Sequence, residues 1–184
     1  MSRLGSLLIA TVLAIAACGG SADSTTQAPT ETTGTPSATT AAPPTPAAGS
    51  PLVISAVDFD TGMIVITNTG NSDYDLAGHQ LCNRPTYVEL PAETLAPGAT
   101  IEIPTSDLGL SPESGEVGLY TARDFGNPEA IIRYVQWGEG DHGRSATAVE
   151  AGIWTSTTDF VPGGFPLYMT SETDPISPND WAAL

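Results

Sequence analysis

Residues 19–50 limit most strongly how this chain can fold. They read GGSADSTTQAPTETTGTPSATTAAPPTPAAGS and contain no leucine, isoleucine, valine or aromatic residue. A segment without large apolar side chains has no face to bury, so it cannot offset the entropy lost on folding. We therefore expect a disordered, partly extended linker over 18–50 and a folded domain confined to 51–184.

The segment before the linker has the organisation of an export signal. Arg3 supplies one positive charge, and an almost unbroken apolar run follows from Leu7 to Ile15. The run is too short to span a bilayer, which needs about 20 apolar residues. The letters IAAC, ending at Cys18, resemble the bacterial lipobox, in which the cysteine is diacylated and becomes the first residue of the mature protein. The resemblance implies a signal peptide over 1–17 and a protein held by lipid on the outer face of the cytoplasmic membrane.

The charge of the chain is strongly negative. It has 21 acidic residues against five basic ones, all of them arginine, and a formal net charge of −16. Such a surface repels the phosphate backbone of nucleic acids and anionic lipid head groups, so we expect no nucleic acid partner. It would attract cations, basic proteins or amino-bearing wall polymers, although the charge also serves solubility alone.

The chain has two cysteines, Cys18 and Cys82. If Cys18 carries lipid, Cys82 has no partner within the chain and is either a free thiol or part of an intermolecular disulfide. Cys82 follows a leucine in an apolar, strand-like run, which favours a buried free thiol. No Cys-His motif accompanies it, so we do not expect a catalytic thiol.

Short apolar runs separated by turn residues fill 51–184, as is typical of an all-β domain. We expect strands over 52–57, 63–68, 76–82, 87–90, 101–103, 116–120 and 130–137, the last of them central, and one short helix within 145–151. About eight strands with turns every 8–12 residues predict an immunoglobulin-like β-sandwich. Trp181, in the irregular tail, is expected to fold back onto the domain.

An opening strand that ends at an acidic turn, Val57-Asp58, is followed by five short motifs at 64–70, 74–81, 95–98, 117–120 and 134–138. Their order resembles the lamin-tail domain family in its bacterial secreted form, and the resemblance covers most of 52–155. Their glycines suit positive φ angles and their leucines suit a core. The resemblance implies an immunoglobulin-like sandwich that binds or scaffolds, commonly beside other domains at membranes, without catalysis.

Alternating carboxylates at strand ends form one candidate metal site. Asp58 and Asp60 follow the first expected strand, and Asp73 and Asp75 follow the second. If both turns lay at the same end of the sandwich, four carboxylates could meet and hold Ca²⁺, which prefers six to eight oxygen ligands. The alternative is that these side chains serve their turns by accepting local backbone hydrogen bonds. No other cofactor is expected.

The glycine-rich stretch 138–145 is a candidate binding loop through His142 and Arg144. Arg144 is expected to pair with a local acid, Asp141 or Glu150. A hydrolase could be drawn from His142 and Ser145, but adjacency in sequence supplies neither convergence nor an oxyanion hole.

In the expected strand 130–137, Arg133 falls on the same side as Val135 and Trp137. A charge beside a core tryptophan requires a partner or a stacked position, so we expect Arg133 to be salt-bridged or stacked.

These patterns together predict a lipid-anchored envelope protein whose domain binds or scaffolds and is not an enzyme. Its expected partners are the membrane, through the lipid, and an envelope protein or a cell-wall polymer. Two alternatives stay open: a calcium-dependent adhesion module built on the acidic turns, and, more remotely, an envelope hydrolase.

Overall fold

The computed structural model of the chain describes residues 49–171 and 174–183. The expected signal peptide, Cys18 and all but the end of the linker lie outside the described residues. Within the described part, no helix is long and apolar enough to cross a membrane.

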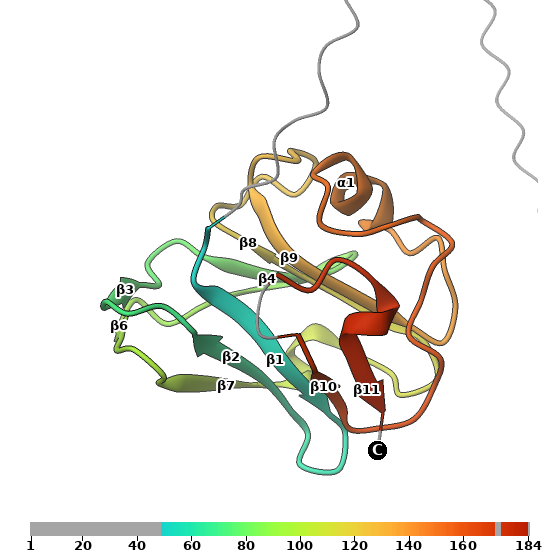
Figure 1. The fold of residues 1–184 in the computed structure, drawn as a ribbon, viewed down its shortest axis with the longest axis horizontal. Helices are drawn as coiled ribbons and strands as arrows, with labels where there is room; N and C mark the ends of the chain where they lie inside the picture. The colour runs from blue at the N-terminus through green and yellow to red at the C-terminus, as the bar shows by residue number, and fades with distance from the viewer. Residues whose placement is uncertain (1–48, 172–173, 184) are drawn as a thin grey trace, which may run out of the picture. The chain divides into compact units, whose positions relative to one another are not determined.

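The described chain is all-β, with one short α-helix and two 3₁₀ turns, as the alternation of apolar runs and turns predicted (Figure 1). A five-stranded sheet has the order β11-β10-β1-β2-β7, a four-stranded sheet has the order β5-β4-β8-β9, and β3 pairs with β6. The elements are β1 (Leu52–Asp58), β2 (Met63–Asn68), β3 (Tyr74–Asp75), β4 (Gln80–Asn83), β5 (Thr86–Glu89), β6 (Thr94–Leu95), β7 (Thr100–Pro104), η1 (Thr105–Leu108), β8 (Gly115–Tyr120), β9 (Ile131–Trp137), α1 (Ser145–Glu150), β10 (Leu167–Met169), η2 (Pro178–Asp180) and β11 (Trp181–Ala183).

The β1–β2 hairpin forms the middle of the five-stranded sheet. In β2, Ile64 and Ile66 are fully buried, and the residues that alternate with them are half-buried. This is the two-residue period of a strand with one covered face. In β1, Ser55 is the extra residue of a bulge, and its hydroxyl donates to the carbonyl of Val65. The bulge therefore keeps a polar residue in β1 without leaving its hydroxyl unbonded.

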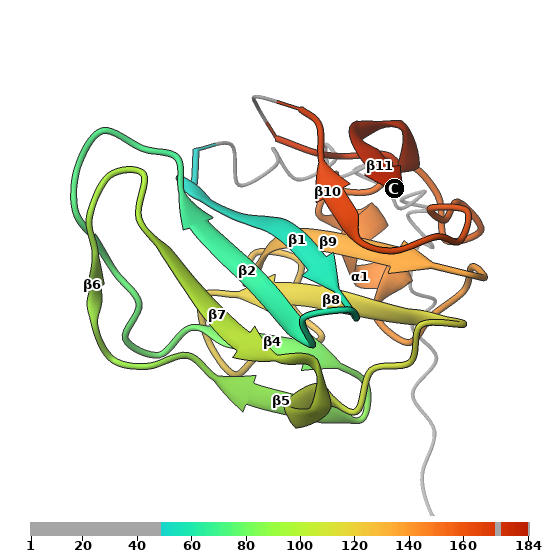
Figure 2. The same cartoon turned by 90° about the horizontal axis from the view of Figure 1, so that it is seen from below.

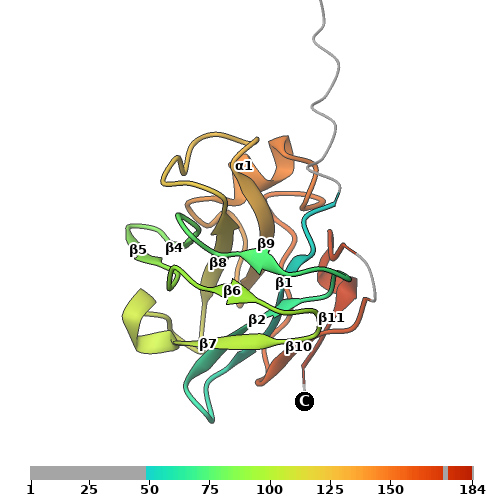
Figure 3. The same cartoon turned by 90° about the vertical axis from the view of Figure 1, so that its left-hand side faces the viewer.

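Side chains from the two larger sheets share one hydrophobic core. Figure 2 shows β1, β2 and β7 on one side and β4 and β8 on the other, and the small β3–β6 pair lies across one end of these layers (Figure 3). Trp137 is fully buried and makes edge-to-face contacts with Phe59 and Phe165. These rings fill the core in place of a disulfide.

Within the four-stranded sheet, β8 and β9 are covered on both faces, because every residue of these two strands is buried, whereas β5 is mostly exposed. Val117 and Leu119 take part in the shared core, and the side chains that alternate with them lie on the other face. There Tyr134 contacts the ring of Trp154, in the segment 138–160 that carries α1. This segment is the lid over the second face.

Two strand predictions need correction. The strand expected over 76–82 begins only at Gln80, because Leu76 closes a turn in which its carbonyl accepts the N–H of His79. The run 130–137 was expected to be central, but β9 is the last strand of its sheet, and beyond it lies only an isolated parallel bridge from Trp137 to Val161. The 138–160 lid, and not a neighbouring strand, accounts for its burial.

Arg133 is salt-bridged, as predicted. It pairs across the sheet with Leu119, on the face of Val135 and Trp137, and its side chain is 3% exposed. Its Nη2 donates to Oδ1 of Asp174 at 2.5 Å and to the carbonyl of Ser50 at 2.6 Å. Burial lowers the pKa of Arg133 and the Asp174 carboxylate opposes that shift. Arg133 thereby holds the residues before β1 and those before η2. Trp181 is buried in β11, so the tail folds back as expected.

Candidate functional site

The structure does not bring the four predicted metal ligands together. Asp58 and Asp60 lie at the β1–β2 turn, whereas Asp73 and Asp75 follow the other end of β2, a six-residue strand about 20 Å long. Within the described residues, no group of three or more histidine, cysteine or acidic side chains is placed to hold a metal ion. Calcium binding therefore remains a prediction, without a shared four-carboxylate site.

Both acidic turns show the local hydrogen bonding that formed the alternative prediction. Oδ1 of Asp58 accepts the N–H of Asp60 at 2.8 Å and that of Thr61 at 3.2 Å, and Oδ1 of Asp75 accepts the N–H of Ala77 at 2.9 Å. Desolvation acts to raise the pKa of Asp58, but the hydrogen bonds from Thr61 and Asp60 outweigh it, and the pKa is lowered. These carboxylates serve as turn-forming groups.

His142 and Ser145 do not form a nucleophile and base pair. The buried hydroxyl of Ser145 donates to the backbone carbonyl of His142 at 2.7 Å, at the start of α1. Nε2 of His142 instead lies 3.0 Å from the hydroxyl oxygen of Ser114, and that hydroxyl is 3.2 Å from a carboxylate oxygen of Glu139. Among the described side chains, none is hydrogen-bonded to Nδ1 of His142, so the third group that orients a catalytic base is not in place.

Arg144 does not pair with Asp141 or Glu150, contrary to expectation, since Arg133–Asp174 is the one salt bridge among the described residues. Its guanidinium lies 5.5 Å from the centre of the Phe125 ring and near the Cys82 thiol, and its Nε is buried without a hydrogen bond among the described residues. Arg144 is therefore turned inward, toward the sheet, and is not the exposed recognition side chain of a loop.

Cys82 is a buried free thiol, as the sequence predicted. Burial raises the pKa of this thiol, although the neighbouring Arg144 opposes the shift. A thiol held protonated and out of solvent is a weak nucleophile. Its role in this structure is packing against β8.

A buried carboxylate organises the interface between the four-stranded sheet and the lid. Glu116, in β8, is 1% exposed and accepts three hydrogen bonds: 2.8 Å from the hydroxyl of Tyr134, 2.8 Å from the N–H of Arg144 and 3.3 Å from the N–H of Arg84. Burial, followed by the Glu116 charge, raises the pKa of Tyr134 above that of a free tyrosine. Glu116 thus ties the start of α1 to the sheet.

Gln136 continues this network toward the surface. Its side-chain carbonyl lies 2.9 Å from the Tyr134 hydroxyl and accepts the N–H of His142 at 3.3 Å. Its amide donates to the carbonyls of Thr157 at 2.8 Å and Asp159 at 2.6 Å. The indole N–H of Trp154 donates to the same Asp159 carbonyl at 2.8 Å. Two buried side chains therefore fix the backbone of the 155–160 loop.

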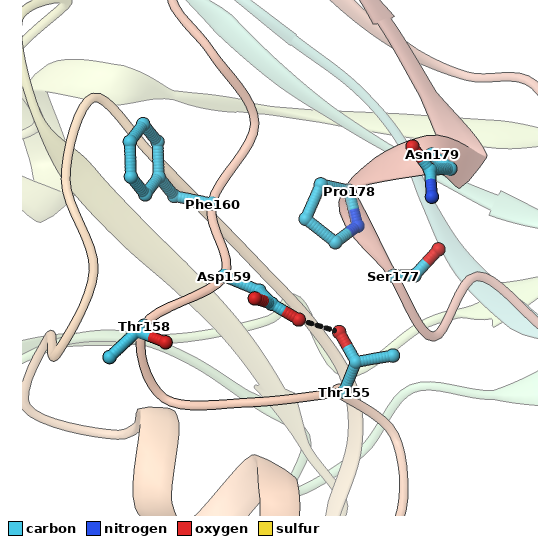
Figure 4. Close-up of a pocket in the computed structure, with 7 residues that line it drawn as sticks. All are labelled: Thr155, Thr158, Asp159, Phe160, Ser177, Pro178 and Asn179. Atoms are coloured by element: carbon cyan, nitrogen blue, oxygen red, sulfur yellow. Dashed lines mark hydrogen bonds between the residues drawn. The ribbon is translucent and has the colours of Figure 1, made fainter.

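This loop forms one wall of a pocket of about 410 Å³, which we call the Phe160 pocket. The other wall is the η2 turn (Figure 4). The pocket is lined by Thr155, Thr158, Asp159, Phe160, Ser177, Pro178 and Asn179. The lining combines hydroxyls, an amide, a carboxylate and a phenyl ring that is 37% exposed. The arrangement suits non-covalent binding of a polar ligand with an apolar face.

No pattern in the sequence predicts the Phe160 pocket. Its two walls are separated by a strand and a turn in the chain, and neither wall carries a motif with a fixed spacing. The available signals were the run of threonines beside Asp159 and Phe160, and the Ser-Pro-Asn-Asp sequence at 177–180, where Ser177 and Asp180 cap the η2 turn.

We compared the chain with family models, curated proteins and solved structures, and none of them matches it.

Proposed function

We propose that this chain is a lipid-anchored protein of the cell envelope, and that its 51–184 domain is a non-catalytic binding module of the lamin-tail, immunoglobulin-like type. One observation carries the proposal. A lipobox-like cysteine, a linker of 32 residues without an apolar face, and an all-β domain with an open polar pocket follow one another along the chain. Each part suits presentation of a binding surface away from a membrane.

The reach of the linker supports this arrangement. A flexible chain of 32 residues spans roughly 30 Å on average, and its prolines extend it further. The first strand begins at Leu52, directly after the linker composition ends. The strong negative charge keeps the domain off anionic head groups, so the lipid alone holds the protein to the membrane.

A non-catalytic role is favoured by the way the reactive side chains are used. The thiol of Cys82 is buried, the hydroxyl of Ser145 is bonded to backbone, and Glu116 is saturated with hydrogen bonds. The Ser114–His142 contact is the one arrangement that would favour a hydrolase, and it lies apart from the residues that line the Phe160 pocket. A cation-dependent adhesion module remains the alternative proposal.

The anchor is tested with the full chain expressed in a bacterial host and labelled with radioactive palmitate. We expect label on the wild type and its recovery in the membrane fraction. Cys18→Ser should lose both, while Cys82→Ser, the matched control at the other cysteine, should keep both. Label retained on Cys18→Ser would contradict the proposal.

The non-catalytic role is tested by assaying the full chain against ester, amide and glycoside substrates. We expect no turnover. Turnover that Ser114→Ala or His142→Ala abolishes, with the melting temperature unchanged, would replace this proposal with a hydrolase.

A further inference from the structure

We propose that the Phe160 pocket is a saccharide site that takes a neutral or amino-bearing sugar unit of a surface polymer. The inference rests on the binding role proposed above and names its ligand class, but it does not depend on the lipid anchor. Four features of the pocket support it: the chemistry of the lining, the lining groups without hydrogen bonds, the fixed backbone of both walls and the negative charge.

The lining matches the surface of a sugar ring. A pyranose presents hydroxyls around its edge, each able to donate and accept, and C–H groups on its faces. The pocket offers hydroxyls from both walls, the Asp159 carboxylate and the Asn179 amide (Figure 4), and the partly exposed Phe160 is among its lining residues. Aromatic rings supply apolar contact area with a defined geometry, and the polar groups fix the orientation of the ligand.

Some of these polar groups are free to bind. One carboxylate oxygen of Asp159 accepts the Thr155 hydroxyl at 2.5 Å, and its other oxygen has no hydrogen bond within the described residues. In the same described part, the exposed side-chain amide of Asn179 makes no hydrogen bond. An acceptor on one wall and a donor–acceptor amide on the other are what a ring with several hydroxyls can bridge.

Both walls are held in place before any ligand arrives. Gln136 and Trp154 are buried and both donate to the Asp159 carbonyl, which fixes the first wall. Asp180 accepts the N–H and the hydroxyl of Ser177, which fixes the second wall next to the buried Trp181. A preformed site loses less conformational entropy on binding than a mobile one.

Charge narrows the class of saccharide. Asp159 is the only charged residue in the lining, and the chain has a net charge of −16. A phosphorylated or uronic polymer would be repelled, because no arginine lines the pocket to pair with its anionic groups. A neutral sugar or an amino sugar, whose ammonium can pair with Asp159, fits the site.

The test is a titration of the full lipidated chain, held in detergent micelles, followed by ¹H–¹⁵N NMR. The probes are the trisaccharides of N-acetylglucosamine, glucosamine, glucose and galacturonic acid. We expect shifts in the amides of 155–160, Ser177 and Asn179 with at least one of the first three, and none with galacturonate. Phe160→Ala should weaken binding about tenfold.

The matched control is Tyr168→Ala, because Tyr168 is 38% exposed against 37% for Phe160 but does not line the pocket. It should leave binding unchanged. Thermal melts check that all variants are folded. Asn179→Ala changes an exposed side chain without hydrogen bonds in the described part, so it should keep the melting temperature and weaken binding.

Two outcomes would overturn the saccharide site: no shift in these amides with any neutral or amino trisaccharide, or equal affinity in Phe160→Ala and the wild type. Crosslinking of an envelope protein to a photoreactive residue placed at position 158, in a chain that keeps its palmitate label, would likewise overturn the saccharide site. That result would still agree with the proposed binding module. Loss of the label on wild-type chain, with saccharide shifts retained, would contradict the anchor alone.

Discussion

The hydroxyl of Tyr134 donates a 2.8 Å hydrogen bond to the carboxylate of Glu116, and both side chains are almost completely excluded from solvent. The two residues lie on neighbouring strands, β8 and β9, on a diagonal of the register, because Glu116 pairs with Gln136 and Tyr134 pairs with Gly118. The same carboxylate accepts the N–H of Arg144 at the start of α1. The Glu116 carboxylate therefore joins the sheet to the 138–160 lid, and the end of this lid forms the first wall of the Phe160 pocket.

Removing the Glu116 carboxylate should unfold the lid more readily. Glu116→Ala leaves two backbone N–H groups without an acceptor in a buried site and removes one of the two acceptors near the Tyr134 hydroxyl. We therefore expect a loss of about 3 kcal/mol in the free energy of unfolding by urea. Glu116→Gln keeps one acceptor oxygen and should lose less. Glu102→Ala, at an exposed position of β7, is the control and should change stability by less than about 0.5 kcal/mol. Equal effects at Glu116 and Glu102 would show that the network does not hold the lid.

Stability should fall at alkaline pH because of three buried groups. Burial raises the pKa of Cys82, Tyr120 and Tyr134 above the ordinary values of 9.0 for a thiol and 10.0 for a phenol. Above those values the unfolded chain has released protons that the folded protein still binds. Their contribution is therefore complete below about pH 9 and is lost as the pH rises toward the folded pKa values.

Tyr134→Phe isolates one of these groups. Near neutral pH it should lower stability by about 2 kcal/mol, because a hydrogen bond to a charged acceptor is lost. Above pH 10 its unfolding free energy should fall with pH by about 1.4 kcal/mol per pH unit less steeply than that of the wild type. Urea melts between pH 7 and 11 measure both effects, with Tyr168→Phe as an exposed control. A wild-type profile that stays flat to pH 11 would contradict the assignment.

Sequence patterns were informative wherever structure is local. The β-branched run Met63–Asn68 predicts a strand, and Asp58 accepts the backbone N–H groups two and three residues ahead, as turn chemistry predicts. The run 130–137 predicts a fully buried strand. It does not distinguish a central strand from an edge strand beneath a lid, because both require the same continuous apolar composition.

Sequence patterns were uninformative wherever distant segments meet. Arg133 was expected to find a partner, but nothing near it in the chain indicates Asp174, 41 residues on. His142 meets Ser114, 28 residues earlier, and not its neighbour Ser145. The Phe160 pocket depends on how β10 returns the chain to place η2 opposite the 155–160 loop. Such pairings follow from topology, which no local spacing encodes.

The salt bridge between Arg133 and Asp174 should hold the second wall of the pocket. Asp174→Ala leaves a buried guanidinium without its carboxylate, and because Asp174 itself is 47% exposed, we expect a loss of about 2 kcal/mol in place of the 3–5 kcal/mol typical of fully buried pairs. Combining it with Arg133→Met should recover part of this loss, since no charge is then left buried. Asp73→Ala, exposed and without a hydrogen bond in the described part, is the control for a lost carboxylate. A double variant as unstable as the sum of both single changes would show that the two residues act independently.

Gly138, directly after β9, should tolerate no side chain. Its φ of +78° is unfavourable for other residues, and a Cβ there would lie 1.9 Å from the backbone carbonyl oxygen of Glu113. Neither strand end can move away easily, because Gly115 and Trp137 pair at this point. We expect Gly138→Ala to lower the free energy of unfolding by about 3 kcal/mol. Gly126→Ala, at an exposed turn where a Cβ meets nothing within 4 Å, should change it little. If both alanine variants melt together with the wild type, the approach of the 113–115 backbone to β9 is not as close as the structure places it.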